Sequence, residues 1–395
     1  MLSSLSSLPT WSSKLVLNKN IKAMNEDMIQ KETPTMELEP LLMHANMLAD
    51  GEGTDIAILG NYPDSDETRM LLTPEACGLL TSSGLKVAME EGAGVDISFG
   101  DDAYAEYGVK IVSRQEALGA NTVLSFSPLR PADIRMMKPG SALLCTMASG
   151  LIDKESIKTL LDMDITMGCL DNMYSHNDTP IFADIIDEID GRAAIMYAQE
   201  NLSYLGGGKG VLLASVAGIN PCEVLIIGDG TDVYSAAKAA LSMGAQVTVV
   251  NNDVSMLAVA RDVCGPQIQT IMIHPRVLYN KVKTADVILL GTTTRPFEFP
   301  KNLSAVMKDS AYVLDFKESH PSVSVPRTVA MALSNVMVNF FEEMRLNESF
   351  DNMISTNEGV QQGIVTYHGK LVDKLVGSYT GLPSADLSVM LAARN

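Results

Sequence analysis

One stretch in the second half of the chain constrains the fold more than any other, because an apolar run leads directly into two glycines and a helix-forming segment. The apolar run is Val224–Ile227, and Gly228 and Gly230 follow it. Such a run is typical of a buried parallel strand. Glycine permits a sharp turn and a close backbone approach to phosphate, and the next helix offers free N–H groups and a positive dipole end. The stretch therefore predicts a Rossmann-type fold with a dinucleotide site.

Several positions in this stretch depart from the usual dinucleotide pattern. Val233 stands where close helix–strand packing usually requires glycine or alanine. Asn251 follows the strand Gln246–Val250 at the ribose-reading position and is neutral, so it lacks the charge-assisted hydrogen bond of an acidic residue. Asp229 and Asp232 lie at the mouth of the phosphate site, where they either cap the helix or repel a pyrophosphate.

The candidate cofactor-binding positions lie in the turn, in the first helical turn, at the end of the next strand and after a later apolar strand. They are Gly228, Asp229, Gly230, Thr231, Asp232, Val233, Asn251, Thr292 and Thr293. No Lys or Arg occupies positions 251–253, where a 2′-phosphate would need one. The cofactor that this pattern indicates is NAD.

Length and charge narrow the class of protein. A chain of 395 residues can build two domains with full cores, and a formal net charge of −19 argues against nucleic acid or an anionic membrane as a partner. The five cysteines are scattered without metal-ligand spacing, so no metal site is expected, and free thiols favour a reducing, cytoplasmic location. Residues 1–53 are expected to be a leader with one helix near Glu37–Leu48, and residues 1–23 lack the features of a secretory signal.

From residue 54 onward, apolar strands alternate with helix-forming segments. Thr73, Pro74 and Glu75 form the start signal of a helix that Gly84 stops. A long helix is expected over Ile185–Tyr204, the glycine-rich segment 206–210 is expected to be a surface loop, and another helix should run from Val325 to Met344. The last segment is expected to be an irregular or helical return to the first domain. The expected strands are Asp55–Leu59, Lys86–Glu90, Asn121–Phe126, Ala142–Met147, Ile165–Leu170, Asp286–Gly291 and Ala311–Asp315. This alternation predicts parallel β-α-β units and hence doubly wound α/β domains.

Short motifs spread over residues 55–390 occur in an order that resembles one enzyme family. They are Glu67–Pro74, Glu91–Gly94, Phe99–Tyr104, Gly208–Gly210, Ile227–Gly230, Val325–Thr328, Ala332–Asn335 and Thr366–Lys370. Together they resemble the alanine dehydrogenase and nicotinamide nucleotide transhydrogenase alpha-subunit family. The resemblance implies a substrate domain from residues 54–185 and 326–395, with a Rossmann-type NAD-binding domain, residues 186–325, inserted into it. It also implies a homo-oligomer that interconverts a small L-amino acid and its 2-oxo acid.

The same resemblance assigns roles to individual residues. Arg69 matches the arginine that binds the substrate carboxylate, a role that suits a planar bidentate group. The family lysine falls in Ser125–Pro128 and the family histidine near Thr146–Ala148, and neither segment holds a basic residue. The slot of the family aspartate falls at Ser319 or its neighbour His320.

Two classes of function remain open on these residues. Lys317, Glu318 and His320 are candidate substitutes for the missing groups, whereas Asp315 is expected to close the last strand. The short path from His320 to Pro326 also leaves no room for the long loop that covers the nicotinamide in the family. The chain is therefore either a divergent dehydrogenase or a relative that senses a ligand or serves as a scaffold. A transhydrogenase module is a third alternative, but it would require a membrane partner.

Overall fold

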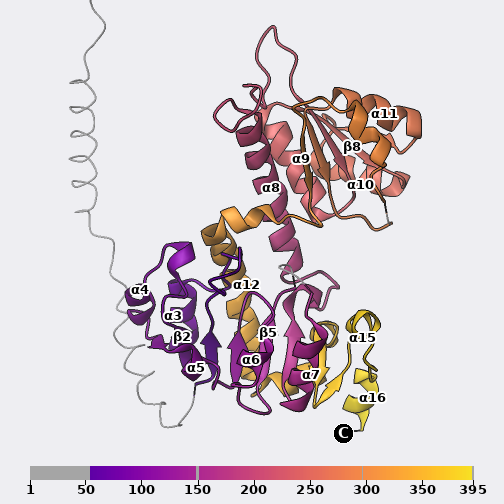
Figure 1. Cartoon of the computed structure of the whole chain (residues 1–395). Coiled ribbons are helices and arrows are strands. Elements are labelled where there is room, and N and C mark those ends of the chain that lie inside the picture. The colour runs from indigo at the N-terminus through magenta and orange to yellow at the C-terminus, as the bar shows by residue number, and fades with distance from the viewer. Residues whose placement is uncertain (1–53, 148–150, 296, 394–395) are drawn as a thin grey trace, which may run out of the picture. The chain divides into compact units, whose positions relative to one another are not determined.

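The computed structural model describes residues 54–147, 151–295 and 297–393 (Figure 1). The chain divides after Asp50 into two units, and the described residues belong to the second. The expected leader and its helix near Glu37–Leu48 lie outside the described residues.

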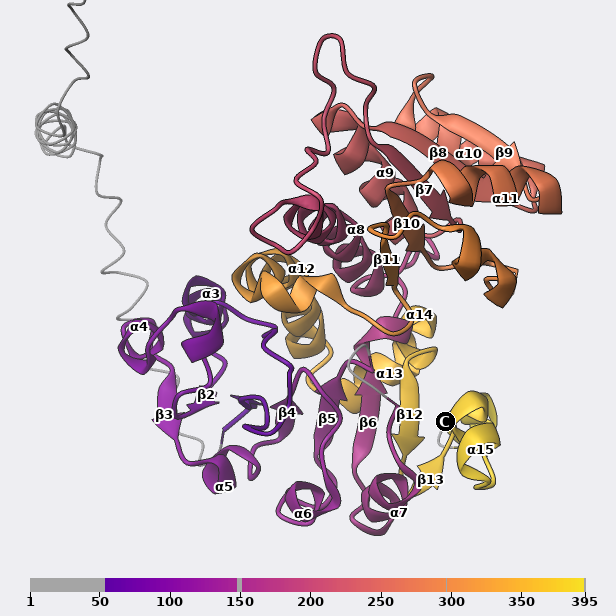
Figure 2. The same cartoon turned by 45° about the horizontal axis from the view of Figure 1, so that its top comes forward.

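The larger sheet has eight strands in the order β13-β12-β6-β5-β4-β1-β2-β3. All neighbouring pairs are parallel except β6–β12 and β12–β13, which are antiparallel. The strands are β1 Ile56–Ile58, β2 Val87–Glu90, β3 Lys110–Val112, β4 Thr122–Leu124, β5 Ala142–Cys145, β6 Thr166–Cys169, β12 Ile364–Tyr367 and β13 Lys370–Leu371. Figure 2 shows β4, β5, β6 and β12 side by side, so the end of the chain returns to the sheet that its beginning forms.

The smaller sheet has five parallel strands in the order β11-β10-β7-β8-β9. The strands are β7 Glu223–Ile227, β8 Gln246–Asn251, β9 Gln269–Met272, β10 Val287–Leu290 and β11 Tyr312–Asp315. The chain reverses its direction of progress between β7 and β10, and that reversal is the topological switch point where doubly wound sheets bind ligands. The Rossmann-type order predicted from the turn after β7 is therefore confirmed.

Helices of varied length connect and cover these strands. They are α3 Pro74–Ser82, α4 Asp101–Ala105, α5 Arg114–Ala117, α6 Pro131–Ile134, α7 Lys154–Asp162, α8 Ala183–Leu202, α9 Thr231–Met243, α10 Val254–Cys264, α11 Pro275–Thr284, α12 Pro326–Leu346, α13 Phe350–Thr356, α14 Glu358–Gln361, α15 Lys374–Thr380 and α16 Leu387–Ala392. Short 3-10 turns add η1 Val95–Ile97, η2 Leu170–Asn172, η3 Lys301–Val306 and η4 Pro321–Ser324. The start signal of α3 is confirmed, because Thr73 Oγ1 accepts a hydrogen bond from the N–H of Ala76 and Pro74 occupies the first helical position.

Helix α8 contributes to two hydrophobic cores. Its first half places Ile186 and Ile189 in the core beneath the eight-stranded sheet, and its second half places Ala194 and Ala198 in the core of the five-stranded sheet. Gly191 lies between these halves, and a Cβ there would lie 2.2 Å from both Asp232 O and Ser235 Oγ on α9. The missing side chain therefore lets α8 and α9 cross at close range.

The prediction of an irregular or helical return after α12 is wrong in one respect. The return contains the antiparallel hairpin β12–β13, whose turn residues His368 and Gly369 have φ of 44° and 68°. Two successive positive φ values are typical of the tight turns that match strand twist. The boundaries proposed for the two domains, at residues 185 and 326, stay predictions.

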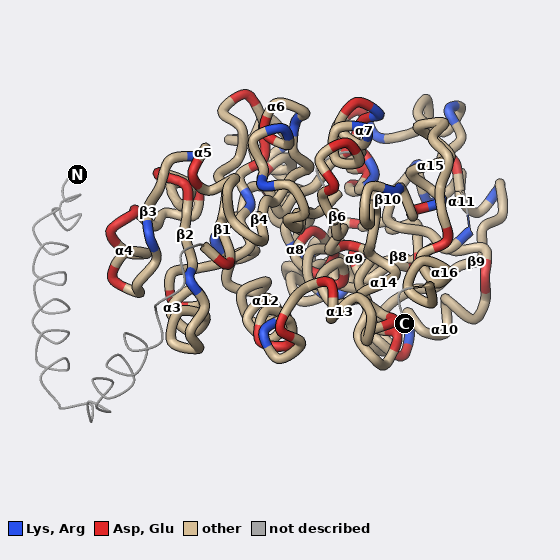
Figure 3. The backbone as a smooth tube through the Cα atoms, turned by 90° about the horizontal axis from the view of Figure 1, so that it is seen from below, with Lys and Arg blue, Asp and Glu red and all other residues tan. Residues whose placement is uncertain are grey.

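Acidic and basic residues are spread along the described chain in Figure 3 and do not gather on one element. Among the helices of the described chain, none combines the length and apolarity needed to cross a bilayer.

Candidate active site

The turn after β7 is closed by the segment that follows β10. The N–H groups of Asp229 and Gly230 both donate to the carbonyl oxygen of Thr292, at 2.9 and 3.2 Å. Gly228 has a φ of +145°, which favours glycine. Cβ atoms at these glycines would approach the chain too closely: one at Gly228 would lie 2.6 Å from Thr292 O, and one at Gly230 would lie 2.7 Å from Thr292 Cβ. Both glycines thus allow the segment after β10 to pack into the turn.

Val233 fits at the third glycine position because a neighbouring strand supplies the missing space. Gly291 directly follows β10, and a Cβ there would lie 2.2 Å from Val233 Cγ2. Gly228 makes similar room, since its Cβ would lie 2.7 Å from the same atom. The departure from the usual pattern is therefore compensated by a glycine on a different strand.

The expectation that Asp229 or Asp232 caps the helix after β7 is wrong, because neither side chain caps α9. The N-cap is Gly230, which has no side chain to cap the helix. Asp229 Oδ1 accepts from the N–H of Thr294 at 2.7 Å, and Asp232 Oδ2 accepts from the N–H of Thr292 at 2.8 Å. Both carboxylates instead anchor the 292–294 segment.

Asn251 ends β8 as expected, but its amide is already used. Its Nδ2 donates to Gly228 O at 3.2 Å and to Asp229 Oδ2 at 3.1 Å, and its Oδ1 accepts from the N–H of Asp253 at 2.8 Å. An acidic residue here would face the Asp229 carboxylate, which explains why a neutral amide suits the position. The predicted ribose contact would have to replace one of these bonds. The roles assigned to Thr231 and Thr293 stay predictions, and Thr231 Oγ1 donates to Asp184 Oδ1 at 3.0 Å.

Carboxyl groups gather where α8 crosses α9. Burial and the nearby carboxylates of Asp232, Asp190 and Asp184 raise the pKa of Asp187 to about 7. Burial also raises the pKa of Asp232, whose Oδ1 is buried and has no hydrogen-bond partner among the described residues. Burial and the neighbouring carboxylates at this crossing therefore favour the protonated form of Asp187.

Arg69 is buried among groups of its own domain and of the segment after β11. Its Nε and Nη2 donate to the two carboxylate oxygens of Glu67 at 2.8 and 2.7 Å, and its Nη1 donates to Ser322 Oγ at 3.0 Å. The guanidinium also lies 4.4 Å from the centre of the Phe126 ring. An arginine has five N–H donors, so two remain, one on each Nη, without a partner among the described residues.

Ser322 connects Arg69 to a second candidate residue. The N–H of Ser322 donates to Asp190 Oδ1 at 2.6 Å, and His320 Nδ1 lies 3.7 Å from Asp190 Oδ2. The imidazole is about one third exposed, whereas the Asp190 side chain is 5% exposed. The structure therefore brings the predicted residues Arg69 and His320 into one polar cluster, which we call the Arg69 cluster: Glu67, Arg69, Asp190, His320 and Ser322.

The remaining candidates after β11 lie outside this cluster. Asp315 is the last residue of β11, as expected, and its carbonyl accepts the N–H of Ser319. Ser319, Lys317 and Glu318 are exposed. The role predicted for Ser319 stays a prediction, and only residues 316–325 separate β11 from α12.

The segments that lack the family lysine and histidine have structural roles. The Arg69 guanidinium lies over the Phe126 ring, and Thr146 Oγ1 donates to Phe126 O at 2.9 Å. Glu67 and Asp190 were missed by sequence reasoning. The spacing of Glu67 two residues before Arg69 was a usable signal, whereas Asp190 is 132 residues from its partner Ser322 and gave none.

A small cavity adjoins the Arg69 cluster. Its volume is about 10 Å³, and its lining includes Gly60, Asn61, Ala93 and Phe126 as well as Arg69. That volume holds about one water molecule, so binding of an amino acid would require the cluster to open. Among the described residues, no group of three or more His, Cys, Asp or Glu side chains is placed to hold a metal ion.

The residues at the switch point fit a dinucleotide in part. The N–H groups of Thr231 and Asp232, in the first turn of α9, have no hydrogen-bond partner among the described residues, and a phosphate needs such donors. The N–H groups of Asp229 and Gly230 would become available only if Thr292 O withdrew.

Comparisons with known proteins identify the family of this chain. A model of the alanine dehydrogenase/PNT N-terminal domain matches residues 63–184, and a model of the corresponding C-terminal domain matches residues 194–301. Together they cover more than half of the chain. The alanine dehydrogenase of Bacillus subtilis (strain 168) is 26% identical over 352 residues, which are 80% of this chain and 92% of that protein. That of Mycolicibacterium smegmatis is 26% identical over 365 residues, which are 83% of this chain and 97% of that protein.

Solved structures show the same fold. An L-alanine dehydrogenase superposes with a TM-score of 0.73 at 22% identity, covering 83% of this chain and all of that one. A transhydrogenase from Sinorhizobium meliloti superposes with a TM-score of 0.66 at 17% identity, covering 81% of this chain and all of that one.

Proposed function

The chain belongs to the alanine dehydrogenase/PNT family, and on that basis we propose that it is an NAD-dependent oxidoreductase that interconverts a small amino acid and its 2-oxo acid. The observation that carries the proposal is the Arg69 cluster. It joins a loop that follows β1 to a loop that follows β11, and both loops leave the carboxyl ends of parallel strands. Ligands of doubly wound sheets bind at such ends.

In this proposal the substrate carboxylate takes the two remaining donors of Arg69. These donors lie on Nη1 and Nη2, one on each nitrogen, and charge-assisted hydrogen bonds from a guanidinium suit a carboxylate. Glu67 holds the rest of the guanidinium and fixes its plane. The Phe126 ring packs against one face of the Arg69 guanidinium and shields its charge from water.

His320 holds the proton in this proposal. Histidine is the side chain whose ordinary pKa suits proton exchange near neutral pH, and the chemistry at the amino carbon requires such a group. Asp190 acts as a positioning residue, because its carboxylate binds the N–H of Ser322 and faces His320 Nδ1. NAD would supply the hydride acceptor, held by the first turn of α9 and the turn at Gly228–Gly230.

Variants of His320 test this assignment. In an assay of NADH oxidation with pyruvate and ammonia, His320→Gln should lower kcat by about 10²- to 10⁴-fold. The fold should be unaffected, since the imidazole is partly exposed. The matched control is His176→Gln, at an exposed histidine outside the cluster. If His320→Gln kept its activity, another group would have to hold the proton.

A second function, ligand sensing without turnover, is favoured by two contacts. Thr292 O accepts hydrogen bonds from the N–H groups of Asp229 and Gly230, and Glu67 occupies the Nε–Nη2 edge of the Arg69 guanidinium. A sensor would bind NADH or a small carboxylate and oxidise neither. The same assay separates the two proposals, because a sensor shows no turnover in the unsubstituted protein.

A further inference from the structure

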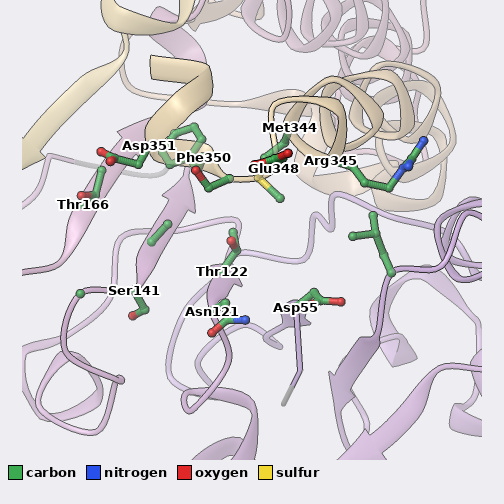
Figure 4. A pocket seen from close by; sticks show the side chains of 14 residues that line it. Asp55, Asn121, Thr122, Ser141, Thr166, Met344, Arg345, Glu348, Phe350 and Asp351 are labelled. Atoms are coloured by element: carbon green, nitrogen blue, oxygen red, sulfur yellow. The ribbon is translucent and has the colours of Figure 1, made fainter. Parts of the chain in front are cut away.

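The cavity in Figure 4 lies at the amino ends of β4, β5 and β6 in the larger sheet. Two charged groups of its lining are already paired, Asp351 with His368 at 3.3 Å and Arg345 with Glu342 at 3.0 Å. Doubly wound sheets bind ligands at the carboxyl ends of their strands instead. The carboxyl end of β8, beside the switch point of the smaller sheet, is therefore the stronger place for a further ligand contact.

Asp253 follows β8 and lies beside a cation from a distant segment. Its Oδ2 is 3.0 Å from Nη2 of Arg295, which comes after β10. Strand β7 lies between β8 and β10 in the sheet. The ion pair therefore bridges the carboxyl end of β7, where the turn Gly228–Gly230 begins and where the cofactor is proposed to bind.

Asn251 stands at the usual ribose-reading position but is committed to the fold. Its Oδ1 accepts the N–H of Asp253 at 2.8 Å, and its Nδ2 donates to Gly228 O and to Asp229 Oδ2. The Asp229 carboxylate is engaged as well, because its Oδ1 accepts the N–H and the hydroxyl of Thr294 at 2.7 and 3.2 Å. Either residue would have to give up one of these bonds to bind a ribose.

The Asp253 carboxylate can accept a further hydrogen bond without such a loss. Its Oδ1 accepts the N–H of Ser255 at 2.9 Å and the Ser255 hydroxyl, and its side chain is 25% exposed. The Ser255 hydrogen bonds and the nearby Arg295 guanidinium hold the pKa of the Asp253 carboxyl below its ordinary value. Each oxygen of an ionised carboxylate has two acceptor sites, so Oδ2 can accept a hydroxyl beside the guanidinium.

We propose that Asp253, instead of Asn251, binds the adenosine ribose of the cofactor and selects NAD over NADP. Its Oδ2 accepts a ribose hydroxyl, which is the bond that an acidic residue makes at this end of a Rossmann-type sheet. A 2′-phosphate would bring negative charge against the carboxylate, and the same carboxylate keeps Arg295 paired. The inference rests on the proposed oxidoreductase function, because it names the residue that selects the cofactor of that function.

Calorimetric titration of the full chain with NADH and with NADPH tests the proposal without turnover. The unsubstituted protein should bind NADH at least about tenfold more tightly than NADPH. Asp253→Asn should weaken NADH binding and strengthen NADPH binding, because it removes the charge and releases Arg295 for a phosphate. The ratio of the two dissociation constants should therefore change at least about tenfold. The fold is spared, since asparagine can keep the N-cap of α10 that Asp253 forms.

Two further variants separate the charge effect from other causes. Arg295→Gln added to Asp253→Asn should remove the gain in NADPH affinity, because no guanidinium then remains for the phosphate. The matched control is Asp262→Asn, at an exposed aspartate of the same helix α10. It should leave both affinities unchanged.

The outcomes distinguish this assignment from the proposed function. The assignment alone is overturned if NADH binds but the unsubstituted protein binds NADPH equally well, or if Asp253→Asn leaves the ratio unchanged. It is also overturned if Asp262→Asn changes the ratio as much as Asp253→Asn does. A protein that binds neither nucleotide contradicts the proposed function, and the role of Asp253 falls with it.

Discussion

Arg69 is a fully buried guanidinium whose charge is balanced by one carboxylate, that of Glu67. The two side chains are 0% and 2% exposed and form two parallel hydrogen bonds. A buried ion pair contributes little net stability, but removal of one partner leaves an uncompensated charge. The cluster is therefore a structural element of the protein as well as a candidate substrate site.

Arg69→Met should lower the free energy of unfolding by about 3–5 kcal/mol, because Glu67 would remain buried without its partner. The double variant Glu67→Gln with Arg69→Met should recover most of that loss, since it buries no charge. Urea denaturation of the three proteins measures both values. A single variant as stable as the unsubstituted protein would mean that Glu67 reaches water. Both variants should lose affinity for pyruvate.

Asp187 gives stability a pH dependence. Its folded pKa of about 7 lies above its ordinary value of 3.8, so between these pH values the folded chain keeps a proton that the unfolded chain releases. The stabilisation of the folded state by the proton on Asp187 is complete below about pH 4. It declines as the pH rises towards 7 and is lost above that pH. Asp187→Asn should therefore gain stability relative to the unsubstituted protein on going from pH 5 to pH 8, on the order of 3 kcal/mol.

Urea midpoints at the two pH values check this expectation. Asp162→Asn, at an exposed aspartate, is the matched control and should change the slope little. Parallel pH curves for Asp187→Asn and the unsubstituted protein would contradict the account.

The predictability of individual residues follows their distance in sequence from their partners. Arg69 could be singled out from a local motif, and His320 from its place after a strand. Asp190 and Ser322 could not, because their contact joins segments 132 residues apart and no local pattern encodes it. The hydrogen bond from the N–H of Thr294 to Asp229 Oδ1 could not be predicted for the same reason, because it joins residues 65 positions apart.

At the scale of elements, the crossing of α8 and α9 depends on one glycine. A methyl group at Gly191 would lie 2.2 Å from Asp232 O and from Ser235 Oγ, so the helices would have to separate. Gly191→Ala should lower the free energy of unfolding by about 1–3 kcal/mol, the usual cost of overpacking.

Thermal unfolding monitored by circular dichroism checks this prediction. The control is Gly100→Ala, because a Cβ at Gly100 meets nothing within 4 Å. Since Gly100 is the N-cap of α4, its replacement should cost only about 1 kcal/mol or less. An equal loss in the two variants would show that the crossing tolerates a methyl group.

Most strands with apolar runs were predictable. The run Val224–Ile227 in the smaller sheet and the buried strands β1, β2, β4, β5 and β6 in the larger sheet gave a clear signal. The edge strand β9 is mostly exposed or half-buried and has no such run. The hairpin β12–β13 was missed because its turn is formed by His368 and Gly369, whereas the commonest signal is Asn-Gly or Asp-Gly.

At the scale of the molecule, the loop between α8 and β7 is notable for its exposed apolar side chains. It has the expected loop character over residues 206–210, and it exposes five large apolar side chains, those of Tyr204, Leu205, Leu212, Val216 and Ile219. Large exposed apolar groups on one segment are typical of contact surfaces. The predicted homo-oligomer remains a prediction that this loop supports.

The central claim is that this family member still binds NAD and still uses it. Calorimetric titration of the full chain with NADH, followed by the assay with pyruvate and ammonia, tests that claim most directly. The account predicts saturable NADH binding and measurable turnover, with Thr292 O yielding the N–H groups of Asp229 and Gly230 to the dinucleotide. Binding without turnover would support the sensing function instead. Absence of NADH binding would contradict the account, because the segment after β10 would then close the site permanently.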